Sequence, residues 1–268
     1  MIHLRSVGRK SGGGAGFPFD VPVIRALTEL TFDAPVTFFV GENGSGKSTL
    51  LEAIALAASL PTVGSADSVR DGTLAKQRAF AKTLKLTWNA RTRRGFFLRA
   101  EDFFGFTKRL AQERSELTAR LADLDDEYKD RSAYAKGLAA GPAVASLADM
   151  ERRYGVDLDA NSHGQSFLKL FQSRFVPGGL YLLDEPEAPL SPQSQLALIT
   201  MMAEMVAQDA QFIVATHSPI VLAFPGARIY SFDGGETKVV EYGALDHVTI
   251  TRDFLNAPER FLRHMLDQ

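Results

Sequence analysis

The sequence feature that most limits the possible folds of the chain is a glycine-rich turn, which lies between a predicted buried strand and a predicted helix. Residues 36–40 read Val-Thr-Phe-Phe-Val, a run that is typical of a strand covered on both faces of a sheet. The six residues that follow include three glycines and suit neither a helix nor a strand. A helix is expected from residue 47 to about residue 60, before Pro61. This order of elements favours an α/β fold.

The glycine turn has the pattern of a phosphate-binding loop. Residues 41–48 match G-x-x-x-x-G-K-[ST], in which glycines let backbone N–H groups point inward at a polyphosphate. The following helix adds the positive end of its dipole. Lys47 would then reach the β- and γ-phosphates of ATP, and the Ser48 hydroxyl would bind Mg²⁺. A chance glycine turn is the alternative, and the preceding strand counts against it. The residues expected to bind nucleotide are Gly41, Glu42, Asn43, Gly44, Ser45, Gly46, Lys47, Ser48 and Thr49.

A second predicted buried strand carries two adjacent carboxylates. Residues 180–183 read Leu-Tyr-Leu-Leu and are followed directly by Asp184 and Glu185. Open α/β sheets bind ligands at the carboxyl ends of their strands. We therefore expect Asp184 to hold Mg²⁺ through water, and Glu185 to act as the catalytic group that polarises the attacking water. An acidic pair exposed after a strand is the alternative.

These two motifs give the chain a family resemblance. Gly-Glu-Asn-Gly-Ser-Gly-Lys-Ser-Thr at 41–49 and Leu-Leu-Asp-Glu-Pro at 182–186 resemble the motifs of ABC-type ATPases, of the soluble SMC/RecF-like kind that includes small predicted AAA-family ATPases. The resemblance implies a P-loop NTPase sheet flanked by helices, with ATP and Mg²⁺ as cofactors. It also implies a helical subdomain at 104–159, inserted between the phosphate loop and the signature. The nucleotide-binding core would comprise 1–103 and 160–268.

Two further segments follow the order of the family's motifs. Asn-Ser-His-Gly-Gln at 161–165 resembles the ABC signature, with His163 where a glycine is usual. In the family this segment contacts the γ-phosphate bound to the opposite subunit, so Ser162, Gly164 and Gln165 are expected at the nucleotide of a head-to-tail homodimer. Ala-Thr-His-Ser-Pro at 215–219 resembles the switch-histidine segment, which implies that His217 bonds the γ-phosphate and orients the water.

Three weaker expectations also come from the resemblance. Glu101 occupies the place of the family's loop glutamine and is a candidate Mg²⁺ ligand, with a simple strand-end acid as the alternative. Ser191 stands where the family has an aspartate at the dimer interface, which leaves its role open. Phe17 and Phe19 are candidates for the aromatic residue that stacks on adenine, or for core residues.

Other elements are expected from hydrophobic periodicity. Residues 106–136 predict one charged helix, which Gly137 and Gly141-Pro142 end before a shorter helix runs to about residue 154. The segment is too short for a long coiled-coil arm. We favour a helical subdomain that covers the sheet, and a partner-binding helix is the alternative. The remaining predictions are strands at 2–7, 84–88, 95–99 and 212–215, a hairpin formed by 228–232 and 238–242, and helices at 196–206 and from about 252.

Composition limits the remaining function classes. The chain has 268 residues with 30 Lys and Arg against 32 Asp and Glu, and no cysteine, which excludes thiolate metal sites and disulfides. No apolar stretch reaches the length of a membrane span, so we expect a soluble, cytoplasmic protein without membrane insertion. Basic clusters at 76–85 and 91–94, the second on a predicted turn between strands, make DNA a candidate partner.

Three functions stay open on the sequence alone. The first is a stand-alone ATPase with ATP-driven dimerisation, acting in DNA repair or defence. The second is the nucleotide-binding subunit of an ABC transporter, against which the wording of the signature and Glu101 count. The third is a nucleotide sensor without hydrolysis, against which the presence of Glu185 and His217 counts.

Overall fold

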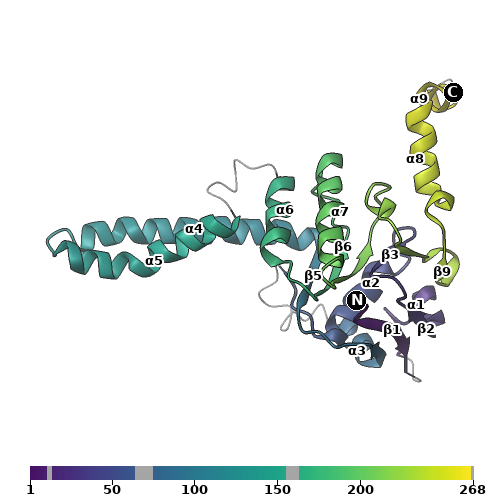
Figure 1. The fold of residues 1–268 in the computed structure, drawn as a ribbon, viewed down its shortest axis with the longest axis horizontal. Coiled ribbons are helices and arrows are strands. Elements are labelled where there is room, and N and C mark those ends of the chain that lie inside the picture. The colour runs from purple at the N-terminus through teal and green to yellow at the C-terminus, as the bar shows by residue number, and fades with distance from the viewer. Residues whose placement is uncertain (11–13, 64–74, 155–162, 267–268) are drawn as a thin grey trace.

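The computed structural model describes residues 1–10, 14–63, 75–154 and 163–266. Within these residues a six-stranded sheet forms the centre of the body, with strand order β5-β6-β7-β3-β8-β9 (Figure 1). Neighbouring strands from β5 to β8 are parallel, and β9 pairs antiparallel with β8. The strands are β3 (Val36–Val40), β5 (Gly95–Arg99), β6 (Leu180–Asp184), β7 (Gln211–Ala215), β8 (Arg228–Ser231) and β9 (Lys238–Val239).

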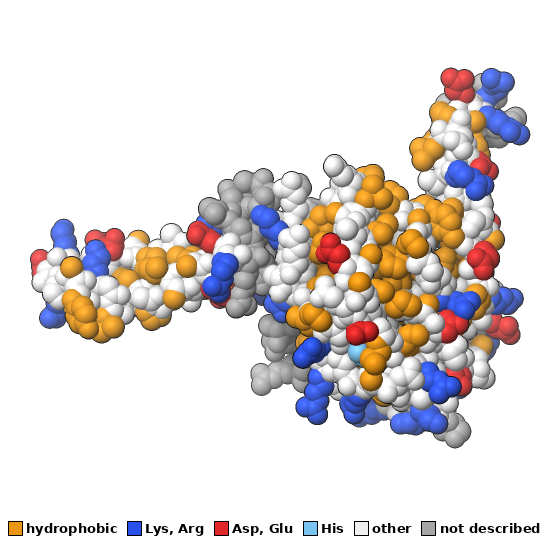
Figure 2. Space-filling model, viewed as in Figure 1, with side chains coloured by type: hydrophobic (Ala, Val, Ile, Leu, Met, Phe, Trp, Pro, Cys, Tyr) orange, Lys and Arg blue, Asp and Glu red, His pale blue; other side chains and the backbone are white. Residues whose placement is uncertain are grey.

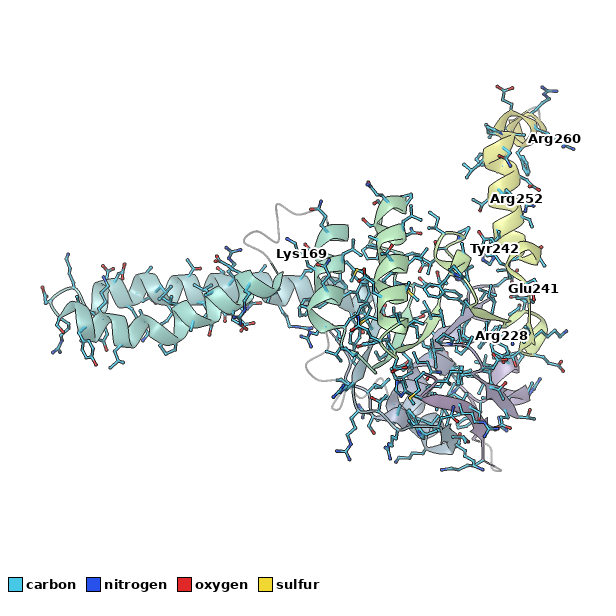
Figure 3. The ribbon with its side chains drawn as sticks, viewed as in Figure 1. Lys169, Arg228, Glu241, Tyr242, Arg252 and Arg260 are labelled. Atoms are coloured by element: carbon cyan, nitrogen blue, oxygen red, sulfur yellow. The ribbon has the colours of Figure 1, made fainter. Side chains whose placement is uncertain are left out.

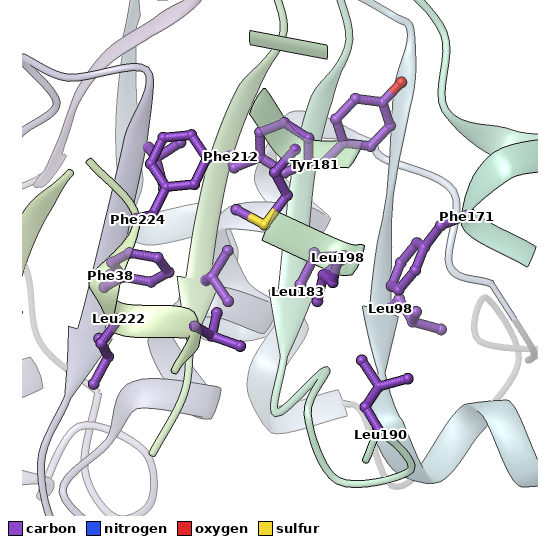
Figure 4. Packing of buried hydrophobic residues seen from close by; sticks show 14 of the residues in the cluster. Phe38, Leu98, Phe171, Tyr181, Leu183, Leu190, Leu198, Phe212, Leu222 and Phe224 are labelled. Atoms are coloured by element: carbon purple, nitrogen blue, oxygen red, sulfur yellow. The ribbon is translucent and has the colours of Figure 1, made fainter. Parts of the chain in front are cut away.

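The central strands are buried on both faces, as their apolar runs predict. Every residue of β3, β6 and β7 is buried. Successive side chains enter different cores, because a strand alternates its side chains between the two faces of a sheet. Phe38 and Leu183 belong to the core under α6 (His163–Arg174) and α7 (Pro192–Val206), which Figure 4 shows. Phe39 and Leu182 belong to the opposite core, which packs against α2 (Lys47–Ala58).

A three-stranded antiparallel sheet completes that opposite core. Its order is β2-β1-β4, and its strands are β1 (Leu4–Arg9), β2 (Glu29–Thr31) and β4 (Leu84–Trp88). Helices α1 (Pro22–Ala26) and α3 (Ala75–Thr83) contribute Ile24 and Phe80 to the same core. The buried Gln211 side chain joins the two sheets. Its Oε1 accepts hydrogen bonds from the backbone N–H groups of His3 and Leu4, and its Nε2 donates to the Leu4 carbonyl.

The arginine-rich segment 91–94 does not form a hairpin tip. The predicted strands 84–88 and 95–99 are both present, but β4 pairs with β1 and β5 pairs with β6, in different sheets. The segment between them crosses from one sheet to the other, and Thr92 Oγ1 donates a hydrogen bond to the Gly178 carbonyl. The interpretation of residues 89–94 as a connecting turn between paired strands was wrong. Strand propensity identifies strands but does not choose their partners.

The middle of the chain forms a helical hairpin, defined here as α4 (Ala100–Glu127) with α5 (Ala133–Tyr154). It extends away from the body instead of covering the sheet (Figure 1). At 28 residues α4 is about 42 Å long. Only its beginning packs on the sheet, where Phe103 and Leu110 are buried in the core under α6.

The predicted helix break at Gly137 and Gly141-Pro142 was wrong. The chain turns at residues 128–132, and α5 contains both glycines and Pro142. Antiparallel packing between the two helices outweighs the poor helix propensity of these residues. Ion pairs from Arg114 to Glu151 and from Lys136 to Asp125 join the helices along their length.

The end of the described chain forms a C-terminal arm, α8 (Asp246–Asn256) followed by α9 (Pro258–Leu266). The arm leaves the body at one end (Figure 1), and its helix begins earlier than the expected residue 252. Short 3₁₀ turns precede it: η2 (Val221–Ala223), η3 (Asp233–Gly235) and η4 (Tyr242–Ala244). The hairpin expected around residues 233–235 is confirmed by the β8–β9 pair. Among the described helices, none has both the length and the apolar character of a membrane span.

Candidate nucleotide site

Three parallel strands end side by side at one edge of the sheet. Ala215 lies opposite both Phe39 of β3 and Asp184 of β6 in the register of the sheet. The phosphate loop, the acidic motif and the switch-histidine segment therefore leave the sheet at the same edge. This is the edge at which open α/β sheets bind ligands.

The phosphate loop has a backbone that only glycine adopts without strain at its key points. Gly41, Gly44 and Gly46 have φ of 143°, 82° and 102°. A side chain at Gly46 would also meet Val21 at 2.9 Å. Lys47 is buried, and its Nζ donates hydrogen bonds to the carbonyls of Gly41 at 2.6 Å and Glu42 at 3.0 Å. Burial lowers the Lys47 pKa, although nearby carboxylates oppose this. The hydrogen bonds of Lys47 thus hold the loop in its folded conformation.

A residue outside the sequence motifs fixes the start of the loop. Asp233 Oδ1 accepts a hydrogen bond from the Glu42 backbone N–H at 2.8 Å, and its Oδ2 accepts one from Ser231 Oγ. Asp233 follows β8, the strand next to β3. The hairpin pattern predicted a turn at this residue but carried no signal that its carboxylate reaches the phosphate loop.

The two predicted Mg²⁺ ligands are in direct contact. Ser48 Oγ donates a hydrogen bond to Asp184 Oδ1 at 3.0 Å. Burial raises the pKa of the Asp184 carboxyl to about 7, and the Ser48 hydrogen bond opposes the rise only in part. Hydroxyl and carboxylate oxygens are the donors that Mg²⁺ prefers, and a cation beside Asp184 would stabilise its charged form. The donor set therefore fits Mg²⁺.

A pocket opens beside this contact. It is lined by Ser48, Thr49, Glu52, Arg99, Ala100, Glu101, Asp184 and Glu185. The Glu185 side chain is exposed, and its backbone has a φ of 50°, a conformation that costs a non-glycine residue energy. Its N–H donates a hydrogen bond to the Ala215 carbonyl at 2.9 Å, which holds the strained turn in place. The structure therefore brings Ser48, Asp184 and Glu185 to one pocket, while their roles stay predictions.

Glu101 lines the same pocket, but its carboxylate is paired with the Arg99 side chain. It lies in the first turn of α4, its side chain is 74% exposed, and its Oε1 accepts a hydrogen bond from Arg99 Nη1 at 3.2 Å. Arg99 also forms an ion pair with Glu52, which lies four residues after Ser48 on α2. Burial raises the pKa of Glu52, and Arg99 opposes the rise. Nothing in the local sequence connects Arg99 with Glu52.

His217 lies immediately beyond β7, beside the acidic motif. Its backbone N–H donates a hydrogen bond to Glu187 Oε1 at 2.8 Å, and its ring is half-buried. A second histidine, His247 at the start of α8, has its ring centroid 6.3 Å from that of His217. Neither Glu187 nor His247 was among the predicted site residues, since no motif spacing relates them to residue 217.

The signature segment is only partly within the described residues. Ser162 lies outside them, so its expected contact and its role as a helix cap stay predictions. Gly164 and Gln165 lie in the first turn of α6, and Gln165 is exposed. The helix is anchored by Phe167 and Phe171, which are buried in the core.

Ser191 and the two candidate aromatic residues have structural contacts. The Ser191 hydroxyl caps α7 by accepting a hydrogen bond from the Ser194 backbone N–H at 3.2 Å. Phe19 packs edge-on against Phe80, with ring centroids 5.7 Å apart, while Phe17 is 47% exposed.

Two segments of the chain match protein-family models. Residues 23–80, which contain the phosphate loop, match the model described as "AAA domain". Residues 165–223, which contain the acidic motif and His217, match "AAA domain, putative AbiEii toxin, Type IV TA system". The sheet topology confirms the predicted α/β fold, and the two matched segments are the ones that carry the phosphate loop and the acidic motif.

Curated proteins and solved structures include similar chains. The Energy-coupling factor transporter ATP-binding protein EcfA2 of Streptococcus thermophilus is 23% identical over 222 residues, which cover 76% of this chain and 68% of the relative. The ADP conformation of an ATP-binding cassette of an ABC transporter has 14% identity, a TM-score of 0.47, and coverage of 99% of this chain and 100% of that one. The Smc head domain from Pyrococcus furiosus, bound to the C-terminal domain of ScpA, has 14% identity, a TM-score of 0.46, and coverage of 96% and 99%.

Proposed function

We propose that the chain binds ATP with Mg²⁺ at the edge of the sheet and hydrolyses it. The observation that carries this proposal is the contact between Ser48 and Asp184 in a pocket that Glu185 also lines. The helix that follows the phosphate loop presents its N-terminus to the same pocket.

The roles of the residues follow from their positions. Lys47 exchanges its hydrogen bonds with loop carbonyls for bonds with the β- and γ-phosphates. Ser48 and Asp184 would hold Mg²⁺, which would neutralise part of the phosphate charge when bound. The Glu185 carboxylate accepts a hydrogen bond from the attacking water and orients this water in line with the γ-phosphate. His217 bonds the γ-phosphate from the neighbouring loop.

The finer proposal is an ATP-dependent homodimer in which each site is completed by the partner. Gln165, in the first turn of α6, is exposed and therefore open to contact with a second chain. Ser162, Gly164 and Gln165 of one protomer would then contact the γ-phosphate held by the other. ATP would close the dimer, and hydrolysis would open it.

A Glu185→Gln variant tests both parts. We expect it to bind Mg²⁺-ATP, to lose at least about a hundredfold of turnover, and to accumulate as a dimer in light scattering. Ser191→Ala serves as the matched control, because it alters a helix cap near the motif and should keep turnover. Turnover equal to wild type, or a variant that stays monomeric with ATP bound, would refute the assigned role or the dimer, respectively.

Contact with DNA is a candidate second function, which a basic groove favours. Lys10, Arg78, Lys82 and Arg91 line a groove together with Trp88. Figure 2 shows Lys and Arg side chains gathered along this lower side of the body. Basic side chains beside a partly exposed aromatic ring suit a phosphate backbone with an unstacked base.

The transporter alternative rests on the EcfA2 relatives. The two functions differ in what stimulates hydrolysis. If DNA is the partner, duplex or single-stranded DNA raises turnover, and Lys82→Ala with Arg91→Ala removes the stimulation while basal turnover stays unchanged. Stimulation by a co-expressed membrane protein, with none by DNA, would support the transporter function instead.

A further inference from the structure

Within the part of the chain that the structure describes, three of the buried polar atoms without a hydrogen-bond partner belong to His217 and to two residues that contact it. They are Nε2 of His217, Nε2 of His247 and Oε2 of Glu187. The groups belong together, because Glu187 Oε1 accepts the His217 backbone N–H and the two histidine rings are 6.3 Å apart. Buried polar atoms of this kind are rare in folded proteins and call for an explanation. His247 is the member that neither the sequence motifs nor the proposed mechanism uses.

The His247 ring packs against the His217 ring rather than bonding to it. The interplanar angle is 63°, an edge-on arrangement, and the centroid distance lies within the range of aromatic contacts. A direct bond between ring nitrogens would need centroids closer than about 5.5 Å. The contact therefore limits the rotation of His217 and leaves its Nε2 without a competing partner.

His247 also lies within electrostatic reach of the nucleotide site. Burial lowers its pKa first, and His217 and Lys47 lower it further, while Asp233 and Asp246 oppose them. The lowered pKa favours the neutral form of the ring.

The backbone around His247 is fixed to the body, whereas the rest of the C-terminal arm is not. Leu245 and Val248 on either side are buried in the core. Tyr242 lies at the base of the arm, just before α8 (Figure 3). Its hydroxyl donates a hydrogen bond to the carbonyl of Pro219, in the same loop as His217. Beyond this base, Ile250 and Leu255 are 59% and 70% exposed. The base of the arm is therefore joined to the His217 loop by two contacts, the Tyr242 hydrogen bond and the His247 ring.

We propose that His247 is a positioning residue for His217, and that through this pair the C-terminal arm responds to the nucleotide state. The inference rests on the proposed function, because His217 is taken to bond the γ-phosphate. A bound γ-phosphate fixes the His217 ring, the His247 ring packs on a fixed partner, and the base of α8 becomes more ordered. The reverse also holds, since coupling between two sites is reciprocal.

The first test separates positioning from folding by steady-state kinetics. His247→Ala should lower kcat about tenfold and leave the KM for ATP within about twofold, since the phosphate loop still binds ATP and the displaced His217 ring loses its bond to the γ-phosphate mainly in the transition state. His247→Phe keeps a ring that packs edge-on and should recover most of the kcat. His3→Phe is the matched control, because it removes a buried histidine with two ring hydrogen bonds on the far side of the body.

The second test measures amide hydrogen exchange in the C-terminal arm. In the Glu185→Gln background, ATP should slow amide exchange in residues 246–256, and His247→Ala or His217→Ala should abolish this protection while ATP binding persists. Wild-type kcat in His247→Ala, or ATP-dependent protection that survives in it, would overturn the inference alone. A wild-type protein that binds ATP but shows no turnover would overturn the proposed function, and with it the kinetic part of the inference.

Discussion

Replacing Asp184 with asparagine should stabilise the nucleotide-free protein, although Asp184 is the expected metal ligand. The carboxyl is buried, which raises its pKa from 3.8 to about 7. Between these two values the folded chain binds a proton that the unfolded chain has released, so stability falls as pH rises. One pKa unit corresponds to about 1.4 kcal/mol, so the charged carboxylate costs about 4 kcal/mol above pH 7. Below pH 3.8 both states are protonated, and the cost vanishes.

Asparagine removes this titration and keeps an oxygen that accepts the Ser48 hydrogen bond. Denaturant unfolding in EDTA should therefore show Asp184→Asn to be more stable than wild type, with the difference growing by about 2 kcal/mol from pH 5 to pH 7. Added Mg²⁺-ATP should reverse the order, because the Asp184 carboxylate is a stronger Mg²⁺ ligand than the amide oxygen of asparagine. The reasoning is refuted if the variant is equally stable or less stable at pH 8 without metal, or if its advantage does not depend on pH.

Three further substitutions probe individual contacts. Lys47→Ala should abolish ATP binding in calorimetry while the circular dichroism spectrum stays that of wild type, and retained micromolar affinity would contradict the phosphate-loop assignment. Glu101→Gln should change kcat less than about threefold, because the Glu101 side chain is mostly exposed and its carboxylate is bonded by Arg99; a loss of a hundredfold with a raised Mg²⁺ requirement would identify Glu101 as a metal ligand. Ser191→Ala should lower the free energy of unfolding by about 1 kcal/mol through the lost cap of α7, and an unchanged unfolding midpoint would show that the cap contributes nothing.

The sequence predicted those parts of the fold that are determined locally. Residues 36–40, 180–183 and 212–215 are continuous apolar runs, and each is a buried strand of the central sheet. Because parallel strands end at one edge, the motifs that follow them could be placed together from the sequence alone. Ser48 and Asp184 meet in this way.

Features that depend on distant parts of the chain could not be predicted. The turn at residues 128–132 replaced the expected break at Pro142, because packing between α4 and α5 stabilises a helix that propensity alone disfavours. The partner of β4 is β1, which lies about 80 residues earlier, and no local pattern selects it.

Contacts between motifs and distant residues of the site could not be predicted either. Asp233, Arg99 and Glu187 reach the motifs from loops or strand ends whose local sequence is ordinary. His247 approaches His217 only because the chain returns to the sheet before α8 begins. Side chains that support a motif from another element leave no signal at a fixed spacing.

The central claim is that ATP is hydrolysed at a site shared by two protomers, and mixing two inactive variants tests it most directly. Lys47→Ala removes the phosphate contact of one protomer, and Ser162→Arg blocks the signature of the other. A heterodimer of the two variants contains one site with both lesions and one site with neither. We predict that each variant alone is inactive and that an equimolar mixture recovers ATPase activity. A mixture that stays as inactive as its components, under conditions in which wild type dimerises with ATP, would contradict the shared site.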